Sequence, residues 1–302
     1  MISITCNINQ MKSVLTTFRA IEEEVLFMFY PDKLKLWMMD KSTSEVLEMN
    51  ADKSAFLNYT CDAEKSVLIG VDSILGKLAR TMEDDTLLIN LAEKSNEVKF
   101  HIIKREQKKI TGNREFSAPI LEQTTPYKDF TRQSANSFKI TSALWKTAIL
   151  DMNVGDRGEK GNFSFAITKD RLKFLSSEVG KIKSKVEYHK SRLREITLTE
   201  ESVNCEFNLF YAFGFFRSIP DDLLLEFYVT SGKPLICRFE MSDIKLGAFE
   251  NTQPFKFMYL LAPIVSRDEN KPKDEDDSGL QLGSEMEVPA LDKKDDDKGL
   301  EL

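Results

Sequence analysis

Two pairs of adjacent aspartates are the residues in this sequence whose types and spacing come closest to a catalytic arrangement. Asp84 is followed by Asp85, and Asp221 is followed by Asp222. Paired carboxylates can hold a divalent cation, which would suit a metal-dependent nuclease. Both pairs precede an expected strand, where Asp commonly forms turns. We therefore expect turns at these positions and predict neither a catalytic residue nor a metal site.

Other catalytic patterns are missing from the sequence. It contains no GxxxxGK[ST] phosphate loop, no GxSxG nucleophile motif and no HExxH zinc motif. The glycine-rich stretch at 155–161 follows an expected helix, whereas phosphate loops open helices. The two histidines are far apart, and no cysteines form a CxxC pair, which is typical of reduced cysteines in an intracellular protein. We expect a protein that is not an enzyme and that has no cofactor.

Basic side chains recur on one face of the expected helices, which cover residues 9–21, 71–82, 142–152 and 208–218. In the first helix an apolar stripe is formed by Met11, Val14, Leu15 and Phe18. The bases on the outer faces are Lys12, Arg19, Lys77, Arg80, Lys146 and Arg217. If the four helices share one surface, it would be positive and could contact phosphates without reading a base sequence.

The net charge of −7 first argues against nucleic acid, because DNA-binding proteins are usually basic. The excess of acids lies entirely in residues 266–302, which also lack aromatic side chains. Such a segment cannot bury enough apolar surface to fold, so we expect a disordered acidic tail. The rest of the chain is neutral and remains compatible with DNA. No apolar run is long enough for a transmembrane helix.

The sequence contains an internal repeat. Asp32-Lys33-Leu34-Lys35-Leu36 recurs as Asp170-Arg171-Leu172-Lys173-Phe174, and the stretch that begins at Asp84 recurs from Asp221 with nearly the same spacing. Alternating apolar and polar residues predict about eight strands in each copy, in addition to two helices. The fold class is therefore α+β, with a duplicated domain. We expect an N-terminal domain at 1–117, a linker at 118–136 and a C-terminal domain at 137–265.

Three stretches resemble the DNA sliding clamps of the proliferating cell nuclear antigen (PCNA) family. They are Trp37-Met38-Met39-Asp40-Lys41-Ser42, Tyr59–Asp62 followed by Ile69–Asp72, and Tyr259–Ile264 with its Leu-Ala-Pro. The resemblance covers residues 1–265. It implies a ring, made in that family of three subunits, whose helices line a hole around duplex DNA. It also implies no catalytic activity, a clamp loader, and a role as a processivity factor that tethers DNA polymerase and other replication and repair enzymes.

The resemblance also assigns residues to surfaces. The DNA channel would contain Lys12, Arg19, Lys77, Arg80, Lys146 and Arg217, while Phe210 stands where the family usually has a base. A pocket for partner peptides would contain Met39, Val46, Pro126, Tyr127, Pro234, Leu260, Ala262 and Pro263. The subunit interface would join strands at 110–118 and 181–188 and would contain Ile110, Arg114, Phe116, Lys181, Lys183 and Lys185.

Two alternatives remain open at this point. The chain could be one subunit of a heteromeric, checkpoint-type clamp instead of a homotrimer. It could also be the metal-dependent nuclease considered above. In the clamp interpretation the partners are double-stranded DNA, the loader, and enzymes that carry clamp-binding peptides. The expected location is with the DNA, in a nucleus or in the cytoplasm of a cell without one, and not in a membrane.

Overall fold

The computed structural model describes residues 1–82, 84–106, 109–123, 127, 134–152, 161–178, 181–242 and 253–264. The described residues all belong to one compact unit of the chain. The expected acidic tail at 266–302 and the expected pocket residue Pro126 lie outside the described residues. Within the described part, no helix is both long and apolar enough to cross a membrane.

The same succession of elements occurs twice along the chain. The first repeat contains β1 (Ile2–Asn7), α1 (Ile8–Arg19), β2 (Glu24–Phe29), β3 (Lys33–Met39), β4 (Glu45–Asp52), β5 (Asn58–Cys61), β6 (Lys65–Gly70), α2 (Val71–Leu78), β7 (Thr86–Leu91), β8 (Glu97–Glu106) and β9 (Lys109–Pro119). The second contains β10 (Ser137–Thr141), α3 (Ser142–Met152), β11 (Asn162–Thr168), β12 (Arg171–Glu178), β13 (Lys181–His189), β14 (Glu195–Thr197), β15 (Ser202–Asn208), α4 (Leu209–Ser218), β16 (Leu224–Tyr228), β17 (Leu235–Met241) and β18 (Phe255–Leu261). A 3₁₀ turn follows β4 (Lys53–Ala55) and β13 (Lys190–Arg192). Each repeat therefore has nine described strands, one more than the sequence predicted.

The strands form three antiparallel sheets. A five-stranded sheet has the order β5-β1-β7-β8-β9, and a four-stranded sheet has the order β13-β12-β11-β15. The nine-stranded sheet has the order β14-β10-β16-β17-β18-β4-β3-β2-β6. Strands from both repeats belong to it, and they meet where β18 pairs with β4. This pairing makes the two repeats one continuous structure.

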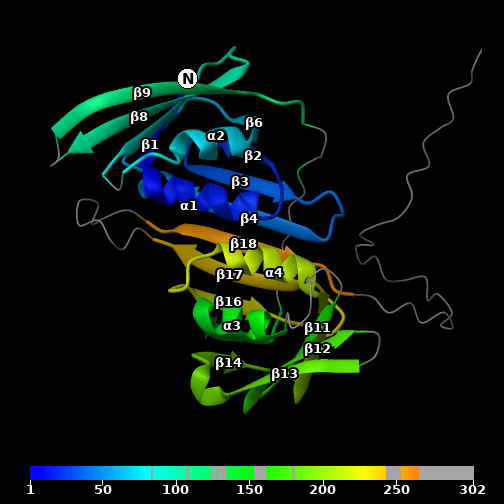
Figure 1. The fold of residues 1–302 in the computed structure, drawn as a ribbon. Helices are drawn as coiled ribbons and strands as arrows, with labels where there is room; N and C mark the ends of the chain where they lie inside the picture. Colours follow the sequence, from blue (N-terminus) through cyan, green and yellow to red (C-terminus); the bar gives the residue numbers. More distant parts are fainter. Residues whose placement is uncertain are drawn as a thin grey trace, which may run out of the picture. The chain divides into compact units, whose positions relative to one another are not determined.

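The four helices form a second layer. Figure 1 shows them on the same side of the sheets, and α1 contacts α2 and α4 while α4 contacts α3. α1 begins where the side chain of Asn7 accepts hydrogen bonds from the backbone N–H groups of Asn9 and Gln10. The predicted apolar stripe of α1 is fully buried in the core between helices and sheets. This burial holds the opposite face of the helix outward, which confirms the orientation inferred from periodicity.

One of the two predicted equivalences between the repeats differs from the structure by one residue. The first backbone N–H of α1, at Ile8, bonds to the carbonyl of Asp85, whereas that of α3, at Ser142, bonds to the carbonyl of Leu223. Asp85 is therefore equivalent to Leu223, and the predicted match of Asp84 to Asp221 is wrong by one residue. The similar residues suggested an offset of 137, whereas the strand pairing on both sides of this region keeps the offset of 138, so Asp84 is equivalent to Asp222. The equivalence of Leu36 and Phe174 is confirmed, because both are buried at the same position of β3 and β12.

Candidate functional site

The helix layer of the first repeat carries three basic side chains without an ion pair to any described residue. Lys77 and Arg80 are exposed at the end of α2, and Lys12 is half-buried on α1. Within the described part of the chain, none of these three forms an ion pair. Arg19 differs, because its Nε donates to Asp72 Oδ1 and its Nη2 lies 3.4 Å from Glu23 Oε1. Its charge is thus largely balanced by Glu23, four residues further along the chain, and by Asp72 of α2, which helical periodicity could not place beside it.

The helix layer of the second repeat is more apolar. Lys146 Nζ donates to the carbonyl oxygen of Ile219 and lies 2.5 Å from Asp221 Oδ1. The guanidinium of Arg217 lies 6.0 Å from the ring centre of Phe213. Leu150 and Phe210 are exposed by 56% and 51%. A groove of about 490 Å³ between α3 and α4 is lined by Lys146, Ile149, Leu150, Phe213, Phe216 and Arg217. The two repeats therefore present chemically different helix surfaces.

The opposite face of the nine-stranded sheet carries a second apolar cluster, which we call the outer cluster. Its buried members are Leu26, Met28, Trp37, Val46, Ile236 and Leu260, and its half-buried members include Met39, Leu68 and Tyr127. Strands β2 and β3 supply side chains to both faces of the sheet, since the alternate residues belong to the main core. The apolar run Val25–Phe29 is the sequence signal for such burial on two faces.

Tyr127, in the segment between the repeats, covers part of this cluster. Its ring meets Trp37 edge-on at 5.5 Å, and its hydroxyl accepts a hydrogen bond from Lys35 Nζ. Lys35 Nζ also lies 2.9 Å from Glu48 Oε2, and both side chains are largely buried. The buried indole Nε1 of Trp37 has no hydrogen-bond partner among the described residues. Tyr127 thus packs against the sheet with both an apolar ring contact and a polar contact.

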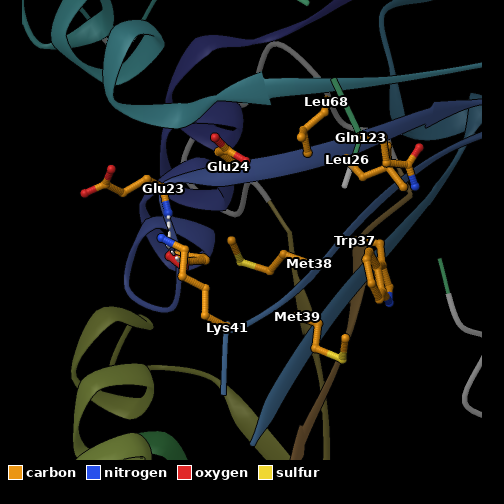
Figure 2. Close-up of a pocket in the computed structure, with 10 residues that line it drawn as sticks. Glu23, Glu24, Leu26, Trp37, Met38, Met39, Lys41, Leu68 and Gln123 are labelled. Carbon is orange, nitrogen blue, oxygen red and sulfur yellow. Dashed lines mark hydrogen bonds and ion pairs between the residues drawn. The ribbon is translucent and has the colours of Figure 1, made fainter. Parts of the chain in front are cut away.

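A pocket of about 150 Å³ opens beside the outer cluster. Figure 2 shows Leu26, Leu68, Trp37 and Met39 around it, with Glu23 and Glu24 near one end. The lining residues come from β2, β3 and β6, from Glu22 and Glu23 before β2, from Lys41 after β3, and from the segment after β9, where Leu121 N donates to the carbonyl of Leu68. The pocket therefore combines an apolar floor with an acidic rim.

The structure gathers several predicted pocket residues. Met39, Val46, Leu260 and Tyr127 all belong to the outer cluster. Ala262 follows β18 and its N–H donates to the carbonyl of Ser44. Pro263 comes next and Pro234 immediately precedes β17, and all three of these small or cyclic residues are half-buried. The predicted set thus extends along one side of the β3–β4–β18–β17 region.

The predicted interface strands are edges. β9 ends the five-stranded sheet and β13 ends the four-stranded sheet. On β9, Ile110 is 65% exposed, Arg114 is exposed and Phe116 is half-buried against Phe100. On β13, Lys185 is exposed, and Lys181 and Lys183 lie in the same strand. The described part of each strand has one free side that could pair with another strand.

A buried hydrogen-bond network joins the two repeats at β4 and β18. Tyr259 OH donates to Glu45 Oε1 at 2.6 Å, and Glu45 N donates to Asp40 Oδ1 at 2.6 Å. Burial raises the pKa of the Glu45 carboxyl to about 8, although the hydrogen bond from Tyr259 opposes the shift. The Tyr259 ring stacks on Phe215 of α4 at 3.7 Å. Sequence reasoning missed this pair because its members are far apart in the chain.

The aspartate pairs show turn chemistry. Asp85 is buried, and its carboxylate accepts hydrogen bonds from Met82 N at 2.9 Å and from Arg105 N at 3.2 Å. Asp221 pairs with Lys146. Among the residues that the structure describes, no three or more His, Cys, Asp or Glu side chains are grouped as metal ligands would be. The arrangement therefore favours the turn interpretation of both pairs.

The comparisons with known proteins agree with the topology. Residues 6–121 match the family model for the N-terminal domain of proliferating cell nuclear antigen. The chain therefore has the PCNA fold, and residues 6–121 are similar in sequence to the N-terminal domain of that family. The PCNA of Thermococcus kodakaraensis superposes with a TM-score of 0.74 at 14% identity, covering 87% of this chain and 100% of that one. The PCNA of Entamoeba histolytica gives 0.73 at 15%, covering 87% and 99%.

A third PCNA structure, from A. fulgidus, contains the bound C-terminal region of FEN-1 and superposes with a TM-score of 0.69 at 16% identity. The superposition covers 88% of this chain and 99% of the A. fulgidus chain. No curated protein sequence matches the chain significantly. The PCNA fold is thus shared at low sequence identity, so this chain's own surfaces determine what it can bind.

Proposed function

We propose that this PCNA-like chain is a DNA sliding clamp that closes into a ring, encircles duplex DNA and acts as a processivity factor for DNA polymerase. The observation that supports it is the division of the sheets. In strand order, the five-stranded and four-stranded sheets correspond to the two parts of the nine-stranded sheet that meet at β18 and β4. Pairing β9 of one subunit with β13 of the next would build a second nine-stranded sheet. Repetition of this head-to-tail contact can close a ring.

The internal junction predicts the register of that contact. Phe116 pairs with Phe100, which pairs with Ile89 of β7. Tyr259 pairs with Cys237, which pairs with Phe227 of β16. Ile89 and Phe227 occupy equivalent positions, so Phe116 is equivalent to Tyr259. Tyr259 faces Leu47 across the junction, and Leu47 is equivalent to Ser184. Phe116 should therefore face Ser184 of the partner subunit, and Glu115 should face its Lys185. The chain's own edges are complementary in charge at this position, which favours a homotrimer over a heteromeric clamp.

The unpaired bases of the helix layer supply the contact to DNA. Such contacts are electrostatic and independent of base sequence, which permits movement along the duplex. We expect Lys12→Glu combined with Lys77→Glu to shorten retention on circular DNA at least tenfold while the ring remains intact. Retention is measured on circular DNA after loading by the organism's clamp loader. Light scattering measures whether the ring remains intact. The matched control is Lys94→Glu with Lys169→Glu, which changes two exposed lysines in turns. Equal retention of both double variants would contradict the proposal.

The outer cluster is the surface that we propose for partner enzymes. It is apolar and partly covered by Tyr127, and in the PCNA family a peptide with a glutamine, an aliphatic residue and paired aromatics binds under this connecting segment. Ala262→Glu should raise the dissociation constant of such a peptide at least tenfold, because it places a charge at the half-buried rim. Fluorescence polarisation provides the measurement. Ala63→Glu, at an exposed alanine outside the cluster, should leave binding unchanged. Tight binding by the Ala262 variant would move the peptide site elsewhere.

A further inference from the structure

The regular pairing of β8 and β9 extends over more residues than the described pairing of β17 and β18. β8 and β9 have 10 and 11 residues, whereas β17 and β18 have 7 each. The ladder of the second repeat ends at Met241 and Phe255, which are equivalent to Lys104 and Gly112. Beyond that point the first repeat adds an irregularity and the pairs Arg105–Ile110 and Glu106–Lys109. The added hairpin end is specific to the first repeat among the described residues.

A buried carboxylate attaches this hairpin end to the helix layer. Asp85, in the loop after α2, accepts a hydrogen bond from Arg105 N as well as one from Met82 N. β9 also contacts α2 directly. Figure 1 shows the end of the β8–β9 hairpin at the same side of the molecule as the loop that follows α2. The hairpin end is therefore held near the basic end of α2, where Lys77 and Arg80 are exposed.

The hairpin end is basic and its charges are not balanced locally. Lys104 and Lys109 are exposed, Arg105 is half-buried, and none of the three forms an ion pair with a described residue. The enclosed Nε of Arg105 has no hydrogen-bond partner in the described part of the chain. The second repeat contrasts with this, because Lys146 is paired with Asp221 and its helix surface exposes Leu150 and Phe210.

We propose that Lys104, Arg105 and Lys109 bind DNA phosphates at one mouth of the channel and, with Lys12, Lys77 and Arg80, hold the duplex against the first repeat. This inference rests on the proposed clamp function and adds a contact outside the four helices. The partner is the phosphate backbone of duplex DNA, because the hairpin continues the unpaired cationic surface of α1 and α2. The more apolar wall of the second repeat would contribute less attraction, because Lys146 is paired with Asp221 there and Arg217 is the one exposed base on its described helices. The ring would thus hold DNA off its axis.

The test is the salt dependence of binding to a linear duplex by the full chain. Each lost phosphate contact lowers the slope of log K against log salt by ~0.9, so Lys104→Gln with Lys109→Gln should reduce it by about 1.8. Lys104→Arg with Lys109→Arg should retain the wild-type slope, because both charges remain. Lys94→Gln with Lys169→Gln is the matched control and should also leave the slope unchanged.

A second pair of variants separates this inference from the clamp function. If Lys12→Gln with Lys77→Gln weakens binding but the hairpin variant retains the wild-type slope, the hairpin proposal is overturned and the clamp proposal stands. If neither double variant changes DNA binding, both are overturned. A hairpin variant that binds DNA normally but loses an acidic polypeptide ligand would likewise overturn the phosphate assignment. Circular dichroism and thermal unfolding should show all variants folded as the wild type is.

Discussion

Reversing one charge on the edge of β13 should dissociate the ring, and reversing its partner should restore it. Lys185→Glu would place a carboxylate opposite Glu115 of the partner subunit and beside Glu187, which now lies 3.1 Å from Lys185. Like charges directly opposite in a sheet cost about 0.2–1 kcal/mol relative to neutral pairs. The same contact occurs at every interface of a ring, so the losses add. We expect the Lys185 variant to be monomeric at concentrations where the wild type is trimeric.

The restoring variant is Lys185→Glu with Glu115→Lys in the same chain. It reverses both signs and should return the trimer, measured as molar mass by light scattering across a dilution series. Lys169→Glu, on an exposed turn, is the matched control. Glu115→Lys alone should weaken the ring as well, because it would place a lysine opposite Lys185 of the partner subunit. It would also remove the contacts of Glu115 with His101 at 3.4 Å and with Lys99 at 3.7 Å. A double variant that remains monomeric, with a wild-type far-UV spectrum, would refute the register Glu115 to Lys185.

Glu45→Gln should remove most of the pH dependence of stability between about pH 5 and 8. The folded pKa of Glu45 is raised to about 8 by burial. In this range the folded protein holds a proton that the unfolded chain releases, so stability falls as pH rises toward the folded pKa. The carboxyl is neutral below that pKa, and ionisation above it leaves a buried charge near Asp40. The loss at pH 8.5 relative to pH 5 is roughly 2–5 kcal/mol.

Urea unfolding at pH 5.5, 7.0 and 8.5 measures this effect. The amide keeps an acceptor oxygen for Tyr259 OH, so the variant should be close to the wild type at pH 5.5 and more stable at pH 8.5. Glu64→Gln, at an exposed position, is the control and should follow the wild-type profile. A Glu45 variant whose stability declines with pH as steeply as the wild type would show that another group is responsible.

Much of the fold followed from local patterns. The apolar stripe of α1 predicted which face would be buried, and α3 spans the predicted residues 142–152. The other three helices begin or end within a few residues of expectation, since chain ends of helices depend on capping groups such as Asn7 and Asn208. The interface strands predicted at 110–118 and 181–188 are β9 and β13. These features depend on residues close together in the chain.

By itself, the sequence determined the duplication, the strand and helix content and the placement of bases on outward helix faces, because periodicity and repeated letters are local properties. Only the tertiary structure decided which bases remain unpaired, since Arg19 meets Asp72 from another helix. It also decided that Asp85 is equivalent to Leu223 and that Asp85 binds the end of the β8–β9 hairpin through Arg105 N. It likewise brought Glu45 and Tyr259 together in the core. Each of these depends on contacts between segments distant in sequence, and such contacts leave no pattern in any one segment.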